Sequence, residues 1–266
     1  MNYRLGFIGV GNMGGALARA ASKSTKQILL CDHDAGKAAE LARYIGCEFA
    51  DSRSVANECQ YVFLGVKPQI MGEVLEEIKK SLEKRPDIVL VSMAAGLSIA
   101  TIRRMAGGDY KVIRIMPNMP ASVGEGEILY TTSENVSKIE IGTFLNLMKH
   151  AGQLTGMDES LMDAGCALSG CGPAFVYKFI RALAQGGTDA GLDGETALSL
   201  AVQTVKGAAK LLESSSQDPD QLIANVCSPG GSTIEGVKVL DEKGMEEAVV
   251  EAITASYKRN IELGNA

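Results

Sequence analysis

The stretch RLGFIGVGNMGGALA, residues 4–18, decides the fold of this chain. Its first part is apolar and predicts a strand at 4–9, whereas the spacing of the residues that follow predicts a helix at 13–22. A glycine-rich turn joins the two. The chain therefore begins as a strand, a tight turn and a helix, which is the opening unit of a parallel α/β sheet.

The turn of this unit carries the pattern G-x-G-x-x-G. Gly9 permits the tight turn, Gly11 lets the backbone approach a pyrophosphate, and Gly14 lets the helix pack on the strand. Because strand, turn and helix all lie where this fingerprint needs them, we predict a dinucleotide site rather than a merely structural turn. Its predicted cofactor contacts are Gly9, Gly11, Asn12, Met13 and Gly14.

The rest of the chain divides into two parts. Short β-like runs alternate with amphipathic helical runs up to residue 156, and only helical spacing follows. Further strands are predicted at 27–31, 61–66, 88–92, 112–116, 128–132 and 152–155, and further helices at 35–45, 70–83, 99–105 and 136–150. We predict an α/β fold, with a Rossmann-like, doubly wound, mainly parallel sheet over 1–156 and an all-α domain over 157–266.

Composition narrows the function classes. The 266 residues carry a formal net charge of −6, and no cluster of Lys and Arg suggests a nucleic-acid surface. No signal peptide or membrane-spanning run is evident, so we expect a cytoplasmic protein that binds neither nucleic acid nor membrane. The six cysteines form no C-x-x-C and pair with neither histidine in a metal-like spacing, which predicts free thiols and no metal.

The residues after the second predicted strand concern the adenine ribose of the dinucleotide. Asp32 lies at about the spacing expected to bind a ribose 2′-hydroxyl, which favours NAD. His33 and Lys37 follow, and either could offer positive charge to the 2′-phosphate of NADP. Alternatively, Asp32 or Asp34 is only the N-cap of the next helix. Both NADH and NADPH stay open as cofactors.

Later strand ends belong to the same predicted site, because open α/β sheets bind ligands at the carboxyl ends of their strands. The segments VFLGVKP (62–68), SMAAG (92–96) and MPN (116–118) each follow or end an apolar strand. A single lysine such as Lys67 is more often solvated, but its place at this edge favours a cofactor contact. The contacts predicted here are Val66, Lys67, Pro68, Ala95, Gly96 and Asn118.

A second glycine-rich turn, SPGGST at 228–233, stands before a predicted helix far along the chain. Ser232 followed by Glu235 matches a capping box, with Ser232 as N-cap. The backbone N–H groups of Gly231, Ser232, Thr233 and Ile234 could then bind a carboxylate or phosphate at the positive end of the helix dipole. An ordinary capped junction is the alternative.

With both turns in view, the chain resembles the pyrroline-5-carboxylate reductase family over nearly its full length. The segments FIGVGNMGGAL, VFLGVKPQ, SMAAGLSI, IRIMPNMP, ALSGCGPAF and NVCSPGGSTIEGVKVLDEKG carry the resemblance. It implies reduction of the C=N bond of 1-pyrroline-5-carboxylate by NAD(P)H to give L-proline, the last step of proline biosynthesis. It also implies that the helical domain is a dimerisation domain, so that the protein is at least a homodimer and could assemble into a homodecamer.

The resemblance assigns roles to single residues. The carboxylate of the substrate would be held by the second turn, and Thr233 would bind the ring nitrogen or relay a proton to it, as the catalytic residue. The alternative for Thr233 is a first-turn helix residue without a chemical role. The substrate-binding residues implied are Ser228, Gly230, Gly231, Ser232, Thr233, Ser169 and Pro173.

This sequence departs from the family at the cofactor end. Many NADPH-using members have Asn or Ser and then Arg where Asp32 and His33 stand, which puts a strong NADPH preference in doubt. Ser52 stands where an Asn is common, so that one amide contact to the cofactor is lost at this predicted cofactor position.

Two other functions compete with this assignment. β-Hydroxyacid dehydrogenases share the first turn but need a Lys one helical turn before an Asn, whereas Lys178 is followed four residues later by Ala182. A protein that senses NAD(H) without turnover would share the fold. Such a sensor has no need for the second anion-binding turn.

Overall fold

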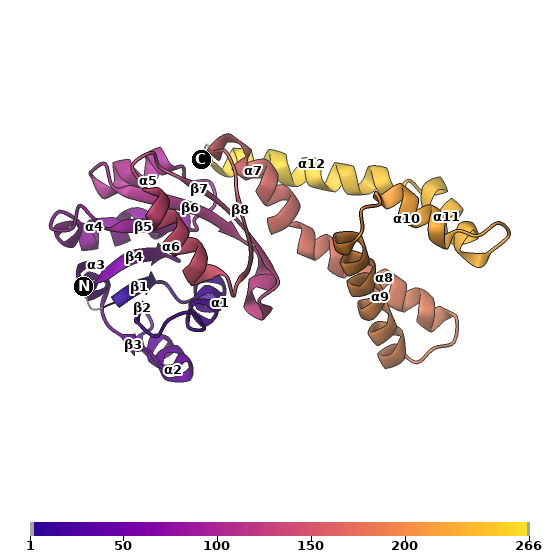
Figure 1. The fold of residues 1–266 in the computed structure, drawn as a ribbon, viewed down its shortest axis with the longest axis horizontal. Coiled ribbons are helices and arrows are strands. Elements are labelled where there is room, and N and C mark those ends of the chain that lie inside the picture. Colours follow the sequence, from indigo (N-terminus) through magenta and orange to yellow (C-terminus); the bar gives the residue numbers. More distant parts are fainter. Residues whose placement is uncertain (1–2, 265–266) are drawn as a thin grey trace. The chain divides into compact units, whose positions relative to one another are not determined.

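The computed structural model describes residues 3–264, and its N-terminal part holds one eight-stranded sheet (Figure 1). The strands are β1 (Tyr3–Ile8), β2 (Ile28–Cys31), β3 (Glu48–Phe49), β4 (Cys59–Leu64), β5 (Val89–Ser92), β6 (Lys111–Pro117), β7 (Gly126–Thr132) and β8 (Gly152–Gly156). Their order is β3-β2-β1-β4-β5-β6-β7-β8. The six strands β1–β6 run parallel, and β7 pairs antiparallel with β6. The predicted mainly parallel, doubly wound sheet is confirmed.

The chain changes direction across the sheet at β1. From β1 it moves outward to β2 and β3, and it then returns to β4 on the other side of β1. The loops that leave the carboxyl ends of β1 and β4 therefore run in opposite directions. Between them lies the crevice in which doubly wound sheets bind nucleotides. Two segments of the predicted cofactor site, at 9–14 and 65–68, leave the sheet at this crevice.

Helices cover the two faces of the sheet. Those of the N-terminal part are α1 (Asn12–Ala21), α2 (Ala35–Ile45), α3 (Ser52–Glu58), α4 (Met71–Leu82), α5 (Ile99–Ala106), α6 (Lys138–Met148) and α7 (Met162–Gly165), with short 3₁₀ turns at Pro68–Ile70, Met119–Val123 and Glu159–Leu161. Helices α1, α2 and α6 share a buried cluster on one face, and α3, α4 and α5 share another on the opposite face.

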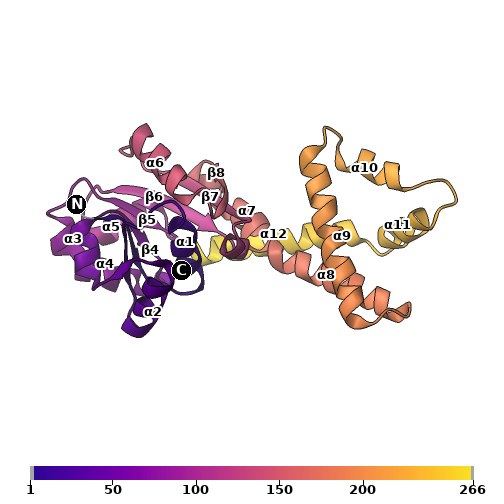
Figure 2. The ribbon, with the colours of Figure 1, turned by 60° about the horizontal axis from the view of Figure 1, so that its bottom comes forward.

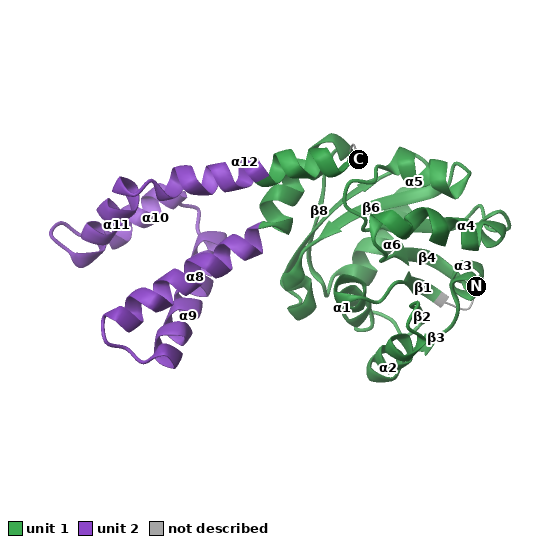
Figure 3. Ribbon diagram, turned by 180° about the vertical axis from the view of Figure 1, so that it is seen from behind, with its two compact units in different colours: residues 1–171, 256–266 green, residues 172–255 purple. Residues whose placement is uncertain are grey.

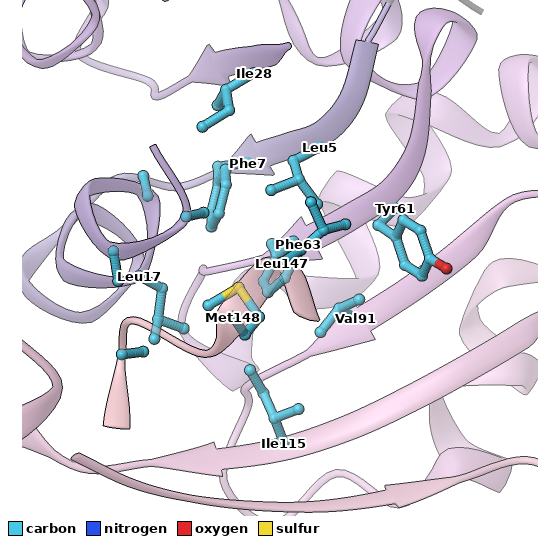
Figure 4. Close-up of a cluster of buried hydrophobic side chains, with 14 of the residues drawn as sticks. Leu5, Phe7, Leu17, Ile28, Tyr61, Phe63, Val91, Ile115, Leu147 and Met148 are labelled. Carbon is cyan, nitrogen blue, oxygen red and sulfur yellow. The ribbon is translucent and has the colours of Figure 1, made fainter. Parts of the chain in front are cut away.

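Alternate residues of the central strands feed these two clusters. On β4, Phe63 packs into the cluster of α1, α2 and α6, while its neighbours Val62 and Leu64 pack into the other. Phe63 is fully buried and stacks on Phe7 of β1 with ring centroids 4.5 Å apart (Figure 4). Strands buried on both faces explain why these runs are apolar throughout rather than alternating.

Two short elements between β2 and β4 were not predicted from the sequence. These are β3, only two residues long, and α3. Both residues of β3 are exposed, so no apolar pattern marks the strand. Helix α3 begins after Asp51, whose side chain accepts a hydrogen bond from the Ser54 N–H, which is an N-cap signal that the sequence carries.

The remaining helices form the C-terminal part of the chain. A π-helical turn at Cys166–Gly170 precedes α8 (Gly172–Asp189), and α9 (Gly194–Ser214), α10 (Pro219–Val226), α11 (Ser232–Glu242) and α12 (Met245–Gly264) follow. Contacts divide the chain into one compact unit of residues 1–171 and 256–266 and a second of residues 172–255 (Figure 3). The predicted all-α character of this part is confirmed, and the domain boundary at 156/157 stays a prediction.

The second unit buries little apolar surface by itself. Helices α8 and α9 lie side by side, where Gly187 faces Ala197 (Figures 1 and 2). Only Ala197 and Ala201 are buried among the described residues of these helices. Large apolar side chains are instead exposed along α8–α12, among them Tyr177, Leu200, Leu211 and Val250. Surface of this kind and extent marks a protein interface.

Replacing Glu140 by glutamine is expected to destabilise the first unit by about 1 kcal/mol at neutral pH. Glu140 Oε1 lies 2.6 Å from Lys111 Nζ, and its other oxygen accepts hydrogen bonds from Ser137 in a capping box that glutamine can keep. Burial raises the pKa of Glu140, but the bonds from Lys111 and Ser137 outweigh burial and lower it below 4.5.

A carboxyl whose pKa is lowered by folding stabilises the folded state above its unfolded pKa, and this stabilisation is lost as the pH falls. The difference between the Glu140→Gln variant and the wild type in urea unfolding should therefore shrink as the pH falls below 4.5, towards the lowered pKa of Glu140 in the folded state. The matched control is Glu134→Gln, because Glu134 pairs with Arg103 but is 75% exposed. An equal loss in both variants would contradict the prediction.

Candidate active site

Three glycines hold the first turn against the neighbouring strand. A Cβ on Gly14 would lie 2.1 Å from the carbonyl oxygen of Gly9, and one on Gly65 would lie 2.3 Å from the same atom. Gly9 has a φ of +94°, which favours glycine. The start of α1 therefore sits directly on the end of β1, as predicted for Gly9 and Gly14.

The middle glycine of the pattern has a different surrounding. A Cβ on Gly11 would meet no heavy atom within 4 Å, so the backbone at the start of α1 faces open space. Gly11 is the N-cap of α1, and no side chain caps it. The first N–H groups of the helix, from Asn12 and Met13 onward, have no acceptor inside the helix. An open cradle with free N–H donors fits the pyrophosphate of a dinucleotide.

Asp32 closes the other side of this turn. Its Oδ2 accepts a hydrogen bond from the Val10 N–H at 2.8 Å, and its Oδ1 accepts one from the Asp34 N–H and lies 2.8 Å from His33 Nδ1. The N-cap of α2 is Asp34, which accepts from the Lys37 N–H. The alternative that Asp32 is the cap is therefore wrong, and its carboxylate belongs to the nucleotide crevice.

A cavity of about 500 Å³ lies beside Asp32. It is lined by Gly9, Asp32, His33, Ser52 and Val66 of the predicted cofactor site. Two further carboxylates, Asp51 and Glu77, also line this cavity. Their charges affect the nearby thiol of Cys31, whose pKa is raised to about 11. Burial is the largest cause, and the negative charges of Glu77, Asp32 and Asp51 follow. This end of the crevice is therefore apolar and negatively charged.

The other predicted cofactor residues occupy loops at the same sheet edge. Lys67 is exposed, and Pro68 opens the 3₁₀ turn before α4. Ala95 is exposed in the loop after β5, whereas Gly96 packs against the end of α12. A Cβ on Gly96 would lie 2.9 Å from the Leu263 carbonyl oxygen. The last turn of the chain thus supports this loop.

The side chain of Asn118, just after β6, joins two other segments of the chain by hydrogen bonds. Its side-chain nitrogen donates to the Ser169 carbonyl at 2.9 Å, and its side-chain oxygen accepts from the Glu127 N–H at 3.0 Å. The residue is only 8% exposed. These bonds favour a positioning role, in which Asn118 holds the π-helical turn that carries Ser169. Pro173 follows in the first turn of α8.

The second glycine-rich turn differs in detail from its prediction. The Gly231 N–H donates to the Ser228 carbonyl at 3.0 Å, and Gly230 has a φ of +71°, as in a type II turn. Helix α11 then begins at Ser232, with Gly231 as its N-cap and without a side-chain cap. The predicted Ser232–Glu235 capping box is therefore wrong.

Two contacts explain why Ser232 and Glu235 do not form a capping box. Glu235 pairs with Lys238, its Oε1 lying 2.8 Å from Lys238 Nζ, instead of reaching back to the N-cap. A Cβ on Gly231 would lie 2.6 Å from Ser228 Oγ and 3.0 Å from the Ser228 carbonyl oxygen, so crowding by Ser228 favours glycine at the cap position. The N–H groups of Ser232, Thr233 and Ile234 start the helix and have no acceptor within it. Ser232 and Thr233 are exposed.

Comparisons with known proteins match both parts of the chain. Residues 159–263 match the family model for pyrroline-5-carboxylate reductase dimerisation, and 4–96 match the model described as NADP oxidoreductase, coenzyme F420-dependent. The chain is 38% identical to pyrroline-5-carboxylate reductase of Aquifex aeolicus, over 97% of each protein. It belongs to the pyrroline-5-carboxylate reductase family. The enzyme of Escherichia coli is 36% identical over all of both chains.

Solved structures of pyrroline-5-carboxylate reductases agree with this membership. One from Coxiella burnetii superposes with a TM-score of 0.90 at 30% identity, covering 99% of each chain. Another, from Plasmodium falciparum with NADP bound, has a TM-score of 0.87 at 31% identity and covers 99% of this chain and 98% of its own. The predicted family, fold and class of NAD(P)-dependent oxidoreductase are confirmed.

The acidic half of the nucleotide crevice was not predicted from the sequence. Asp51 is the N-cap of α3, which was not predicted, and Glu77 lies on α4; only the fold brings the two to the same cavity. Among residues 3–264, no group of three His, Cys, Asp or Glu side chains could hold a metal ion. All six cysteines are free, as predicted. No helix in this part of the chain is long and apolar enough to span a membrane.

Proposed function

We propose that the protein reduces the C=N bond of 1-pyrroline-5-carboxylate to give L-proline, the last step of proline biosynthesis. The observation that supports this most strongly is the presence, in one family member, of two glycine-rich turns that each lead into a helix without a side-chain cap. One is the open cradle at Gly11, and the other is the type II turn before α11. A dinucleotide sensor would need only the first.

The cofactor end holds and aims the dinucleotide. The open backbone at Gly11 and the first N–H groups of α1 would bind the pyrophosphate. When bound, NADH or NADPH supplies the hydride. Asn118 fixes the turn that carries Ser169, so we assign these two residues to shaping the pocket rather than to chemistry.

The second turn binds the substrate carboxylate. Three free N–H groups at the positive end of α11 and the Ser228 hydroxyl are the donors. Gly230 and Gly231 keep the backbone open to the anion, because the positive φ of Gly230 favours glycine and a Cβ on Gly231 would crowd Ser228. Holding the ring by its carboxylate orients the imine carbon, and orientation accounts for much of the acceleration.

Thr233 is the proposed catalytic residue. It stands one position inside α11, beside the donors that hold the carboxylate. Its hydroxyl can both donate and accept, so it can bind the ring nitrogen and pass on a proton from solvent. A threonine alone is a poor acid at neutral pH, and the proton therefore comes from water through this hydroxyl.

The test of this function is oxidation of NADH or NADPH at 340 nm in the presence of 1-pyrroline-5-carboxylate. Turnover that depends on the imine and yields proline supports a reductase. Tight binding of the cofactor without turnover would instead favour a sensor of NAD(H).

Oligomeric state is measured on the same sample. We expect at least a homodimer, and mass measurement in solution will tell a dimer from a decamer. A cytoplasmic location stays a prediction.

We further propose that NADH is preferred over NADPH. Asp32 borders the cavity together with Asp51, and a 2′-phosphate placed there would meet both negative charges. The Asp32→Asn variant is expected to raise the ratio of kcat/KM for NADPH to that for NADH by about tenfold. Asparagine keeps an oxygen that can accept from the Val10 N–H, so the turn survives.

The matched control is Asp34→Asn, two residues away. An asparagine at this position would still cap α2, and the charge removed points to the helix rather than to the cavity. An Asp34→Asn variant that shifts the cofactor ratio as much as Asp32→Asn would show that only overall charge matters.

A further inference from the structure

The cavity beside Asp32 has the composition expected for a purine base. Its walls are apolar, and the base would lie between them with its polar edge directed to the rim. The residues that form these walls are Ala38, Phe49, Ala50, Val66, Ile70 and Val74. This assignment of the cavity rests on the proposed function, in which the dinucleotide lies across Gly11.

Glu77 lines this cavity, and the proposed mechanism assigns it no role. Glu77 comes from α4, and its Oε1 accepts a hydrogen bond from Ser52 Oγ at 2.6 Å. Ser52 opens α3 and is 5% exposed, so it is a fixed donor that holds the carboxylate at the cavity. Among residues 3–264, Glu77 Oε2 has no hydrogen bond or ion pair.

The negative charge of Glu77 affects the Cys31 thiol, which lines the same cavity. Among the charged groups, it contributes most to the raised pKa of Cys31, after burial of the thiol itself. Cys31 ends β2 at the base of the crevice and lines the same cavity. Glu77 and Cys31 therefore line one cavity, and the carboxylate adds to its negative charge.

We propose that Glu77 selects the adenine base of the cofactor by accepting a hydrogen bond from its 6-amino group, and that Ser52 positions it. A carboxylate only accepts hydrogen bonds, and the 6-amino group is the donor on the edge of adenine. A base with a carbonyl at position 6 would set an acceptor against this charge. Sites built to bind one hydrogen-bonding group reject an analogue that lacks it.

The test compares NADH with deamino-NADH, in which hypoxanthine replaces adenine, by direct calorimetric titration without substrate. The wild type should bind deamino-NADH about tenfold more weakly, the lower end for a bond to a charged group, since Glu77 is exposed to solvent. Glu77→Gln should lose most of this discrimination, because an amide can donate to the carbonyl. Ser52→Ala should lose part of it, without a change in the preference set by Asp32.

The matched control is Glu76→Gln, which removes the same charge from the neighbouring residue. Glu76 pairs with Lys79 and does not line this cavity. Equal affinity of the wild type for the two cofactors, or equal effects of Glu76→Gln and Glu77→Gln, would overturn the proposal. Because binding is measured without the imine, the calorimetric result can be interpreted even if the protein does not turn over 1-pyrroline-5-carboxylate. Conversely, equal binding of the two cofactors would leave the reductase assignment intact.

Discussion

Replacing Gly11 by valine is expected to weaken NADH binding by about a hundredfold while the protein stays folded. A Cβ at this position would meet no heavy atom of the protein within 4 Å. The φ of Gly11 is −60°, so the backbone accepts an ordinary residue. The added side chain would fill the open space that the pyrophosphate needs. Calorimetric titration with NADH and thermal unfolding of the same variant measure both effects.

Gly14→Ala provides the contrast. Its Cβ would lie 2.1 Å from the Gly9 carbonyl oxygen, so the helix must move away from the strand, and both stability and cofactor binding should fall. Gly72→Ala is the control for a glycine-to-alanine change in a helix, because nothing lies within 4 Å of its Cβ. Normal NADH affinity in Gly11→Val would contradict the assignment of the first turn.

Replacing Thr233 by valine is expected to lower kcat by about a hundredfold, the effect typical of losing one positioned donor or proton relay. Valine keeps the branched shape of threonine and removes only the hydroxyl. Thr233 is exposed in the first turn of α11, so its loss should not unfold the helix. Steady-state kinetics with 1-pyrroline-5-carboxylate and NADH measure the change.

Thr233→Ser is the matched variant, since it keeps the hydroxyl and should retain most of the activity. NADH affinity should be the same in both variants, because the residue belongs to the second turn. Full activity of Thr233→Val would mean that the N–H groups of α11 and solvent suffice for the reaction. Thr233 would then be a structural residue of the first helical turn.

The elements whose side chains face the core could be predicted from the sequence. Phe63 and its neighbours on β4 form an apolar run because both faces of the strand are covered. The same holds for the turn at Gly9, where the pattern of glycines has one steric explanation. These predictions depend on local patterns, which the sequence displays directly.

The rest depends on partners that lie far apart along the chain. Ser232 and Glu235 have the spacing of a capping box, but Gly231 takes the cap position and Lys238 takes the carboxylate. Glu77 lies 25 residues from Ser52, and only the packing of α3 and α4 brings the two together. Spacing alone cannot reveal such pairs, because the fold decides which local signal prevails.

The most direct test of the proposed function is the fate of the hydride. NADH carrying deuterium at both positions of nicotinamide C4 is incubated with 1-pyrroline-5-carboxylate and the protein, and the product is analysed by mass spectrometry and NMR. A reductase of this imine yields L-proline with one deuterium on the former imine carbon. Unlabelled proline, or oxidation of NADH without proline, would contradict hydride transfer to the C=N bond and with it the proposed reduction of 1-pyrroline-5-carboxylate.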